Sequence, residues 1–378
     1  MIGDQFGRRI PADPEALRAG GSHFLTELFV KFSRDMNSPV RDRGRTQMEP
    51  EVRFAVLSRA PEFPIAVPRP QFGDYHRDSG TGLLITERIS FGANGIERQY
   101  HKCLDYEMPE PYEHYRALLT AVARLAGTHQ SGHLPASLTQ HLPVDMQAAT
   151  VGEPAPLNAD KVRRRLDQLA EFVETHPSLV PVNVRAPDFI ARLRDDVPRF
   201  MQHEPAVWRH LAGDPNYVAL CPWNANVDNA WFWRDTDNVL NCGLMDWGCV
   251  SQMNVGMAIW GAMSGAETDL WNHHLDDLLH VFVAEVDRCG GPNLDEGELR
   301  THTTLYAAIM GVTWLLDVPA LIRARFGRSA DLRSRTDPRI KDDESVRAPL
   351  QMMANFLNLW ETQRFGDVFE AVLARRAG

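Results

Sequence analysis

The chain has 378 residues with 44% hydrophobic and 24% charged side chains, an ordinary composition for one large globular domain or two smaller ones. Its formal net charge is −10, which excludes the basic surface that nucleic-acid binding requires. No run approaches the roughly 20 apolar residues of a membrane span, and the five scattered cysteines lack the spacing of a zinc site or a disulfide framework. We therefore expect a cytoplasmic protein that binds neither nucleic acid nor membrane.

The first ninety residues predict a small, sheet-rich unit. Residues 24–33, "FLTELFVKFS", have the β-branched and aromatic enrichment of a strand. Residues 48–59 have apolar positions at helical spacing. The proline-interrupted stretch 63–76 predicts edge strands or extended connectors, and residues 81–89 predict a short buried strand. No convincing strand and glycine loop come before residue 24.

Helical periodicity dominates the rest of the chain. The exception is 218–250, where short strands alternate with polar residues. The segments with helical spacing are 112–130, 159–175, 187–213, 254–264, 269–288, 296–325 and 348–376. The polar stretch 327–347 predicts a mobile surface loop. The expected architecture is α+β and two-lobed, with a sheet-rich lobe over 1–88 and a helical lobe over 89–378.

Lys31 is the first candidate functional residue. It lies in "LFVKF", in a chain that has only four lysines among 40 basic residues. A lysine on a strand can guard an exposed edge, or it can bring a compact charge to a phosphate. A phosphate-binding lysine needs a carboxylate partner, which the next helix offers as Glu49 or, preferably, Glu51.

Asn229 and Asp246 are the second candidate pair. Asn229 precedes the apolar run "AWFW", and Asp246 follows the next run, in "CGLMDWG". If these runs pair as a hairpin, the two side chains meet at its open end. Amide and carboxylate oxygens suit Mg²⁺. The alternative for Asp246 is a structural aspartate that caps a turn.

The 218–250 stretch resembles the catalytic segment of the protein-kinase-like fold. In both, a loop with an asparagine leads into a strand, a hairpin turn and a second strand, which ends in Asp-aromatic-Gly. It is most similar to the aminoglycoside phosphotransferase and choline kinase branch, and "LFVKF", "MEPEVRFAVL", "GLLITERI" and "ALLTAVARLAGTHQSG" extend the resemblance over most of the chain. The resemblance implies two-lobed architecture and Mg²⁺-dependent use of ATP.

The resemblance also assigns site residues. Lys31 would bind phosphates and Glu51 would orient it. The main chain from Glu87 to Ile89 would hold adenine. Asn229 and Asp246 would hold Mg²⁺.

The catalytic loop departs from the family pattern at two positions. Placing Asn229 on the family asparagine puts Pro222 at the usual histidine and Asn224 at the usual catalytic aspartate. An asparagine cannot take a proton, but it can orient a hydroxyl, and Asp228 is a candidate substitute base. General-base catalysis contributes about 10²- to 10⁴-fold, so its loss predicts a slow enzyme.

Two functions remain open at this point. The first is ATP- and Mg²⁺-dependent phosphorylation of a hydroxyl on a small molecule. The second is a catalytically silent pseudokinase that binds nucleotide or a partner protein, which Asn224, Pro222 and the unrecognised glycine loop favour.

Overall fold

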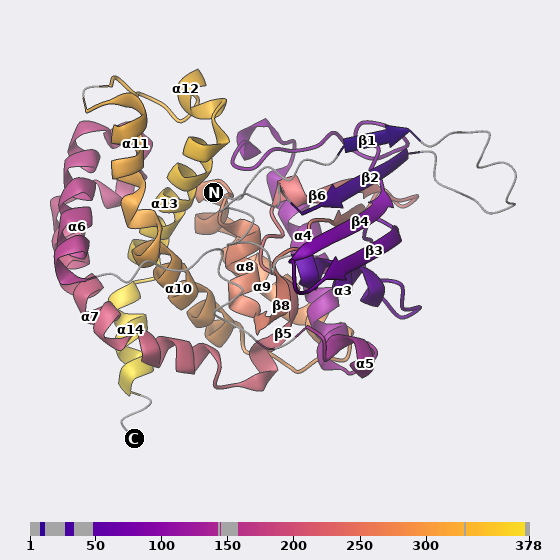
Figure 1. The fold of residues 1–378 in the computed structure, drawn as a ribbon. Coiled ribbons are helices and arrows are strands. Elements are labelled where there is room, and N and C mark those ends of the chain that lie inside the picture. Colours follow the sequence, from indigo (N-terminus) through magenta and orange to yellow (C-terminus); the bar gives the residue numbers. More distant parts are fainter. Residues whose placement is uncertain are drawn as a thin grey trace, which may run out of the picture.

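The computed structural model describes residues 8–11, 27–33, 48–142, 144, 158–328 and 330–374. A four-stranded sheet with one helix on it lies beside a larger part made mainly of helices (Figure 1). This is the two-lobed α+β architecture that the sequence predicts.

The sheet carries Lys31 on an inner strand. Its strands are β1 (Arg8–Pro11), β2 (Glu27–Phe32), β3 (Pro70–His76) and β4 (Thr81–Glu87). They run antiparallel in the order β1-β2-β4-β3, and Lys31 is opposite Leu84. The expectation that no strand precedes β2 is wrong, because Arg8–Pro11 pairs along its whole length with β2. The question of a glycine loop falls on residues 12–26, which lie outside the described residues.

Helix α3 (Met48–Leu57) packs on this sheet through an apolar stripe. Met48 and Val52 are both buried and one turn apart, so they share a helix face. Two glycines in the sheet leave room for that helix face. A Cβ on Gly82 would lie 2.4 Å from Met48 Cγ, and a Cβ on Gly73 would lie 3.3 Å from Val52 Cγ1. The close packing fixes where the helix presents Glu51.

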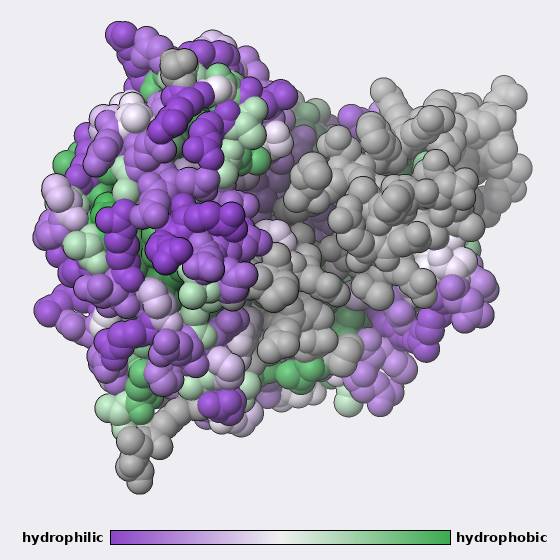
Figure 2. Space-filling view, turned by 60° about the vertical axis from the view of Figure 1, so that its left-hand side comes forward, coloured by the Kyte–Doolittle hydropathy of each residue, from purple (hydrophilic) through white to green (hydrophobic). Residues whose placement is uncertain are grey.

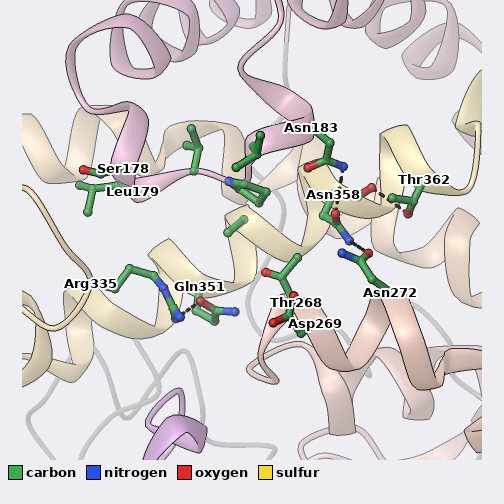
Figure 3. Close-up of a pocket in the computed structure, with 14 residues that line it drawn as sticks. Ser178, Leu179, Asn183, Thr268, Asp269, Asn272, Arg335, Gln351, Asn358 and Thr362 are labelled. Carbon is green, nitrogen blue, oxygen red and sulfur yellow. Dashed lines mark hydrogen bonds between the residues drawn. The ribbon is translucent and has the colours of Figure 1, made fainter.

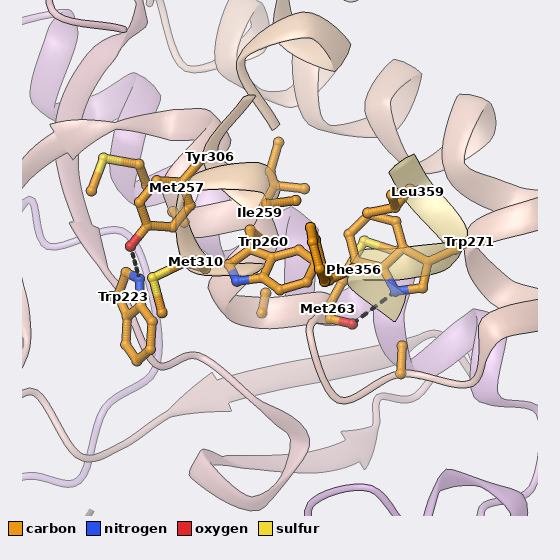
Figure 4. Packing of buried hydrophobic residues seen from close by; sticks show 14 of the residues in the cluster. Trp223, Met257, Ile259, Trp260, Met263, Trp271, Tyr306, Met310, Phe356 and Leu359 are labelled. Atoms are coloured by element: carbon orange, nitrogen blue, oxygen red, sulfur yellow. Dashed lines mark hydrogen bonds between the residues drawn. The ribbon is translucent and has the colours of Figure 1, made fainter. Parts of the chain in front are cut away.

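The helical lobe surrounds a single large core. Its helices are α4 (Pro111–Gln130), α5 (Ala136–Thr139), α6 (Ala159–Thr175), α7 (Pro187–Leu211), α8 (Val255–Met263), α9 (Thr268–Arg288), α10 (Glu296–Thr313), α11 (Val318–Phe326), α12 (Pro338–Lys341), α13 (Glu344–Thr362) and α14 (Phe365–Ala374). Trp260 and Trp271 fill the centre of the core, with ring centroids 5.8 Å apart (Figure 4). Both tryptophans are core residues here.

Two antiparallel strand pairs are embedded in the helical lobe. Strand β5 (Val218–Pro222) pairs with β8 (Val250–Asn254), which the sequence did not reveal as a strand, and β6 (Ala230–Arg234) pairs with β7 (Leu240–Leu244). The hairpin expected between the two apolar runs is therefore confirmed. The loop 223–229 leaves β5 and enters β6, so both of its ends are held by sheet pairing.

Two long helices expected from periodicity are each broken in the structure. The 296–325 segment stops at Thr313, passes through a 3₁₀ turn and restarts as α11, with Pro319 in its first turn, where a missing N–H is tolerated. The 348–376 segment divides between α13 and α14 at Arg364, whose φ is +48°. In both places local backbone chemistry overrides a continuous apolar stripe.

The 296–326 stretch has the length and apolar composition of a membrane span, but 72% of its most apolar window is buried within the fold. It is therefore a core segment. Hydrophilic side chains cover most of the described face of the helical lobe in Figure 2.

The expectation of a mobile loop over 327–347 is wrong for much of its length. Leu332 and Ile340 are buried there, and α12 begins at Pro338.

The loop 223–229 is anchored on α8 and α10. A Cβ on Gly261 would lie 1.7 Å from Trp223 O, so α8 touches the loop directly. On the other side, Trp223 Nε1 donates a hydrogen bond of 2.6 Å to the Tyr306 hydroxyl (Figure 4). These contacts hold the first residue of the loop from two directions.

We expect Gly261→Ala to destabilise the protein by about 1 to 3 kcal/mol, because the added methyl overlaps the Trp223 carbonyl. Urea unfolding measures the change. The matched control is Gly366→Ala in the first turn of α14, where a Cβ would meet Asp196 Oδ2 at an ordinary 3.5 Å, so the gain in helix propensity should raise stability by up to about 1 kcal/mol. A Gly261→Ala protein as stable as the control variant would contradict the close packing.

Candidate active site

Lys31 forms the centre of a buried ion cluster. Its Nζ lies 2.6 Å from Glu51 Oε2 and 2.7 Å from Asp246 Oδ1, and its side chain is 7% exposed. Glu51 comes from α3 and Asp246 follows β7, so the cluster joins the sheet lobe to the helical lobe. Of the two glutamates considered, Glu51 is the partner, while Glu49 pairs with Arg53 and Arg77.

The charges in this cluster change one another's pKa values. Burial alone would lower the pKa of Lys31, but the attraction of Glu51 and Asp246 outweighs it and the pKa lies well above its usual value. Burial raises the pKa of Glu51, and Asp246 adds to this effect. Lys31 and the Trp247 backbone N–H act in the opposite direction. The ammonium is therefore held firmly charged between two carboxylates.

Asp246 occupies a constrained turn. Its φ is +61°, in the left-handed region that non-glycine residues adopt rarely. The next residue, Trp247, stacks on Phe54 of α3 with ring centroids 3.7 Å apart, and its Nε1 donates to Leu244 O. Since Phe54 lies one turn after Glu51, this stack fixes Asp246 and Glu51 relative to each other.

Asn229 lies at the open end of the β6–β7 hairpin, beside Asp246. The Met245 N–H donates to Asn229 O at 2.9 Å, so Asn229 contacts the residue before Asp246. Asn229 Nδ2 donates to Asn224 O at 2.8 Å, which turns the amide so that its oxygen remains available. Asp246 likewise keeps one carboxylate oxygen beyond its bond to Lys31. Amide and carboxylate oxygens are ligand types that suit Mg²⁺.

The connection after β4 lies at a second open region. Glu87 N–H donates to Arg69 O and Arg88 N–H donates to Glu27 O, so Ile89 is the one member of the predicted 87–89 segment with an uncommitted N–H among the described contacts. A cavity of about 790 Å³ opens here, lined by all three residues together with Trp231 of β6. Its size and partly apolar lining suit a flat heterocycle.

Asn224 and Asp228, the two candidates for catalysis, lie in the loop that also supplies Asn229. Asn224 is 5% exposed, and its Oδ1 has no hydrogen-bond partner among the described residues. Asp228 Oδ1 is buried and also lacks a partner there, and its main-chain oxygen accepts from Gln99 Nε2 at 3.4 Å. Asp228 thus faces segment 99–105.

Sequence reasoning missed two buried charged residues in that segment, Lys102 and Asp105. Asp105 is fully buried and accepts a 2.6 Å hydrogen bond from the Tyr115 hydroxyl, and burial raises its pKa to about 7. Lys102 is 6% exposed. The scarcity of lysine, which singled out Lys31, was the available signal for Lys102.

A cluster of His210, Glu298 and His302 also has possible metal-ligand atoms close together. The tautomer of His302 disfavours a metal there. Asn254 Oδ1 accepts from Gly256 N–H and its Nδ2 donates to Leu211 O, so that amide is oriented as a donor toward His302 Nδ1. The neutral ring then carries its proton on Nε2, the nitrogen that faces Glu298. The described part of the chain shows no other such cluster.

A polar cavity of about 520 Å³ lies in the helical lobe between the connector before α7 and helices α9 and α13 (Figure 3). A ladder of amides crosses it: Asn183 Nδ2 donates to Asn358 Oδ1, and Asn358 Nδ2 donates to Asn272 Oδ1. Arg335 at its edge bonds Gln351 and Glu267. No residue of loop 223–229 lines this cavity.

Together these features define a two-lobed, protein-kinase-like fold: a strand-borne lysine, a helix glutamate that pairs with it, and an Asn–hairpin–Asp segment in the helical lobe. No protein-family model matches the chain, and no curated protein is similar to it at a significant level.

Solved structures give weak similarities. A choline/ethanolamine kinase family protein from Mesorhizobium loti is 15% identical, with a TM-score of 0.40 over 91% of this chain and 86% of that one. Plasmodium vivax ethanolamine kinase is 10% identical, with a TM-score of 0.43 over 87% and 75%. A microcompartment-associated aminopropanol kinase is 12% identical, with a TM-score of 0.41 over 96% and 94%. These proteins are of the kind that the sequence resembles.

We expect Lys31→Met to destabilise the protein more at pH 8 than at pH 5. Removing the ammonium takes away the main influence that lowers the pKa of Glu51, so this pKa rises further above its unfolded value. A carboxyl with a raised folded pKa stabilises the fold fully at low pH, and that stability is lost as pH rises through the folded pKa. Leaving a buried charge unpaired costs about 3 to 5 kcal/mol.

Urea unfolding at the two pH values tests this, relative to the unmodified protein. The double variant Lys31→Met, Glu51→Gln is the control, because it lacks the titrating carboxyl and should lose the extra pH dependence. An equal loss at both pH values would show that Glu51 is not the responsible group.

Proposed function

We propose that the protein transfers a phosphoryl group from ATP, with Mg²⁺, to an oxygen of a small molecule. The observation that carries the proposal is Lys31, held charged at 2.6–2.7 Å from two carboxylates that come from different lobes. A buried three-charge cluster is a poor source of stability, so a role in binding accounts for it better than a role in folding.

In this proposal each residue has one task. Lys31 binds nucleotide phosphate oxygens, and Glu51 holds the ammonium in place. Asn229 and Asp246 provide oxygens to Mg²⁺, which neutralises phosphate charge when it is bound. A bound metal would take Asp246 as a ligand. Lys31 would then lose its contact with Asp246, contact a phosphate oxygen in its place, and keep its contact with Glu51.

The 87–89 segment and the neighbouring cavity would receive the base of the nucleotide. Ile89 N–H is available to it, and Trp231 offers an apolar wall. The acceptor expected from the sequence is a hydroxyl, oriented by Asn224 or deprotonated by Asp228.

A pseudokinase is the alternative, and Asn224 favours it. The side chain at this loop position cannot act as a base. In that case the same cluster would bind nucleotide without turnover.

We expect ATP with Mg²⁺ to raise the melting temperature, because a ligand of the folded state stabilises it by mass action, by about 2.7 kcal/mol at 100 times Kd. Asp246→Ala should remove the Mg²⁺-dependent part of the shift. Asp237→Ala, at the exposed hairpin turn, is the matched control. No shift at millimolar ATP would contradict both the kinase and the pseudokinase.

Turnover separates these two functions. We expect slow ATP consumption that falls about 10²- to 10³-fold in Asp246→Ala, the scale for losing one electrostatic contact to the transition state. Coupled ADP release measures it, with Asp237→Ala again as control. ATP binding with equal, background ADP release in all three proteins would identify a pseudokinase.

A further inference from the structure

A stripe of polar side chains runs along one face of α13. Its members are Gln351, Asn355, Asn358 and Thr362, which lie three or four residues apart and therefore share one side of the helix. The three amides are at most 1% exposed, although amide side chains are mostly found at protein surfaces. Gln351, Asn358 and Thr362 line the cavity of about 520 Å³ in Figure 3.

The buried amides are all hydrogen-bonded within the fold. Gln351 Nε2 donates to Ala266 O at 2.7 Å. Asn355 Nδ2 donates to Ser264 O at 2.9 Å and to Ala266 O at 2.8 Å, and its Oδ1 accepts from the Thr268 hydroxyl at 3.1 Å. A buried polar network that is fully satisfied is rigid, so this wall of the cavity is formed before any ligand binds.

The amide chain across the cavity ends in free hydrogen-bonding capacity. Asn183 Nδ2 donates to Asn358 Oδ1 at 3.0 Å, and Asn358 Nδ2 donates to Asn272 Oδ1 at 2.8 Å. Asn183 Oδ1 and Asn272 Nδ2 have no partner among the residues that the structure describes, and both residues line the cavity. Reversing all three amides would exchange the two ends, but one donor and one acceptor would remain.

The charges at the cavity are already compensated. Arg335 Nη2 lies 2.6 Å from Glu267 Oε2, and its other branch binds the Gln351 amide. Asp269 is exposed in the first turn of α9, where the positive end of the helix dipole stabilises a carboxylate. The described lining residues therefore offer no unpaired cation to an anionic ligand and only a weak attraction to a cationic one.

The connector before α7 gives the cavity an aliphatic wall. Residues 179–182, Leu-Val-Pro-Val, line it there, and Figure 3 shows Leu179 across the cavity from Thr268. None of the described lining residues is aromatic, so the cavity offers no ring surface to a flat heterocycle. Amides on one side and aliphatic carbon on the other match a carbon skeleton that carries hydroxyl groups, because a hydroxyl both donates and accepts hydrogen bonds.

We propose that this cavity binds an uncharged polyhydroxyl compound, a sugar or a polyol, whose hydroxyl groups bond Asn183 and Asn272 and whose carbon skeleton lies against residues 179–182. The volume of about 520 Å³ is within the usual range for small-molecule sites. The inference is independent of the proposed function, since binding requires neither ATP nor turnover. The compound is either the phosphoryl acceptor or the ligand of a second site, and a turnover experiment separates the two.

Glucose, myo-inositol and sucrose are the probes. Saturation-transfer NMR on the full chain without nucleotide detects direct contact, which the general exclusion of sugars from protein surfaces does not produce. We expect at least one probe to bind with a Kd in the millimolar range or tighter. If none of the three binds, the proposal is overturned.

Asn272→Ala removes the donor at one end of the amide chain. We expect about 3- to 10-fold weaker binding of the probe, the scale for losing one neutral hydrogen bond. His273→Ala, at the next and exposed position of α9, is the matched control and should bind as the unmodified protein does. Equal binding by the two variants would show that the probe does not contact this amide, which contradicts the proposed site.

Ala354→Leu tests the cavity by filling it. Because Ala354 lines the cavity, we expect the larger side chain to weaken probe binding by about 10-fold or more. Ala371→Leu on the exposed side of α14 is the control, and thermal unfolding checks that both variants are folded. A folded Ala354→Leu protein that binds as tightly as the control would place the probe elsewhere and overturn the proposal.

Glucosamine and gluconate test the charge of the ligand, because they add an ammonium or a carboxylate to a similar skeleton. We expect both to bind more weakly than the best uncharged probe. Binding of either that is tighter by about 10-fold or more would overturn the uncharged class and assign the cavity to a cation or an anion.

Turnover then identifies the source of the ligand. If the bound probe is the acceptor, phosphorus NMR after incubation with ATP and Mg²⁺ shows a phosphate ester of that probe, and Asn272→Ala lowers kcat/KM as it lowers binding. Binding without ester formation assigns the cavity to a second site. Binding of the probe by a protein that shows no response to ATP would contradict the proposed function and leave the polyhydroxyl site supported.

Discussion

The ion cluster around Lys31 is the constraint on which the rest of the site depends. One ammonium bridges a helix of the sheet lobe and a turn of the helical lobe, at distances of 2.6–2.7 Å. Two carboxylates compete for it, so the cluster carries a surplus negative charge that nucleotide phosphates with Mg²⁺ could rearrange. Burial makes the arrangement sensitive, because each charge is stabilised only by the others.

Apolar packing places those charges. The stacking of Trp247 on Phe54 holds the Asp246 turn against α3. Gly73 and Gly82 let α3 approach the sheet closely. On the other side of the site, Trp223 fits against Gly261 and hydrogen-bonds Tyr306. The polar residues of the 218–250 stretch are thus positioned by large side chains that pack into both lobes.

Loop 223–229 has an amide at position 224. Its Oδ1 is buried without a partner among the described residues, and so is Oδ1 of Asn226. An amide cannot take a proton, so this side chain cannot supply base catalysis.

The sequence alone was enough to predict most strands and helices, the hairpin, and the pairing of Lys31 with Glu51, since these depend on periodicity and short spacing. It could not reveal β8, the breaks at Pro319 and Arg364, or the β1–β2 pairing, which depend on what the chain meets in space. The burial of Lys102 shows the difference most clearly. The scarcity of lysine marks this residue in the sequence, but its 6% exposure depends on contacts of its main chain with α13 and of its stem with the turn after α8, because burial is a property of the folded chain.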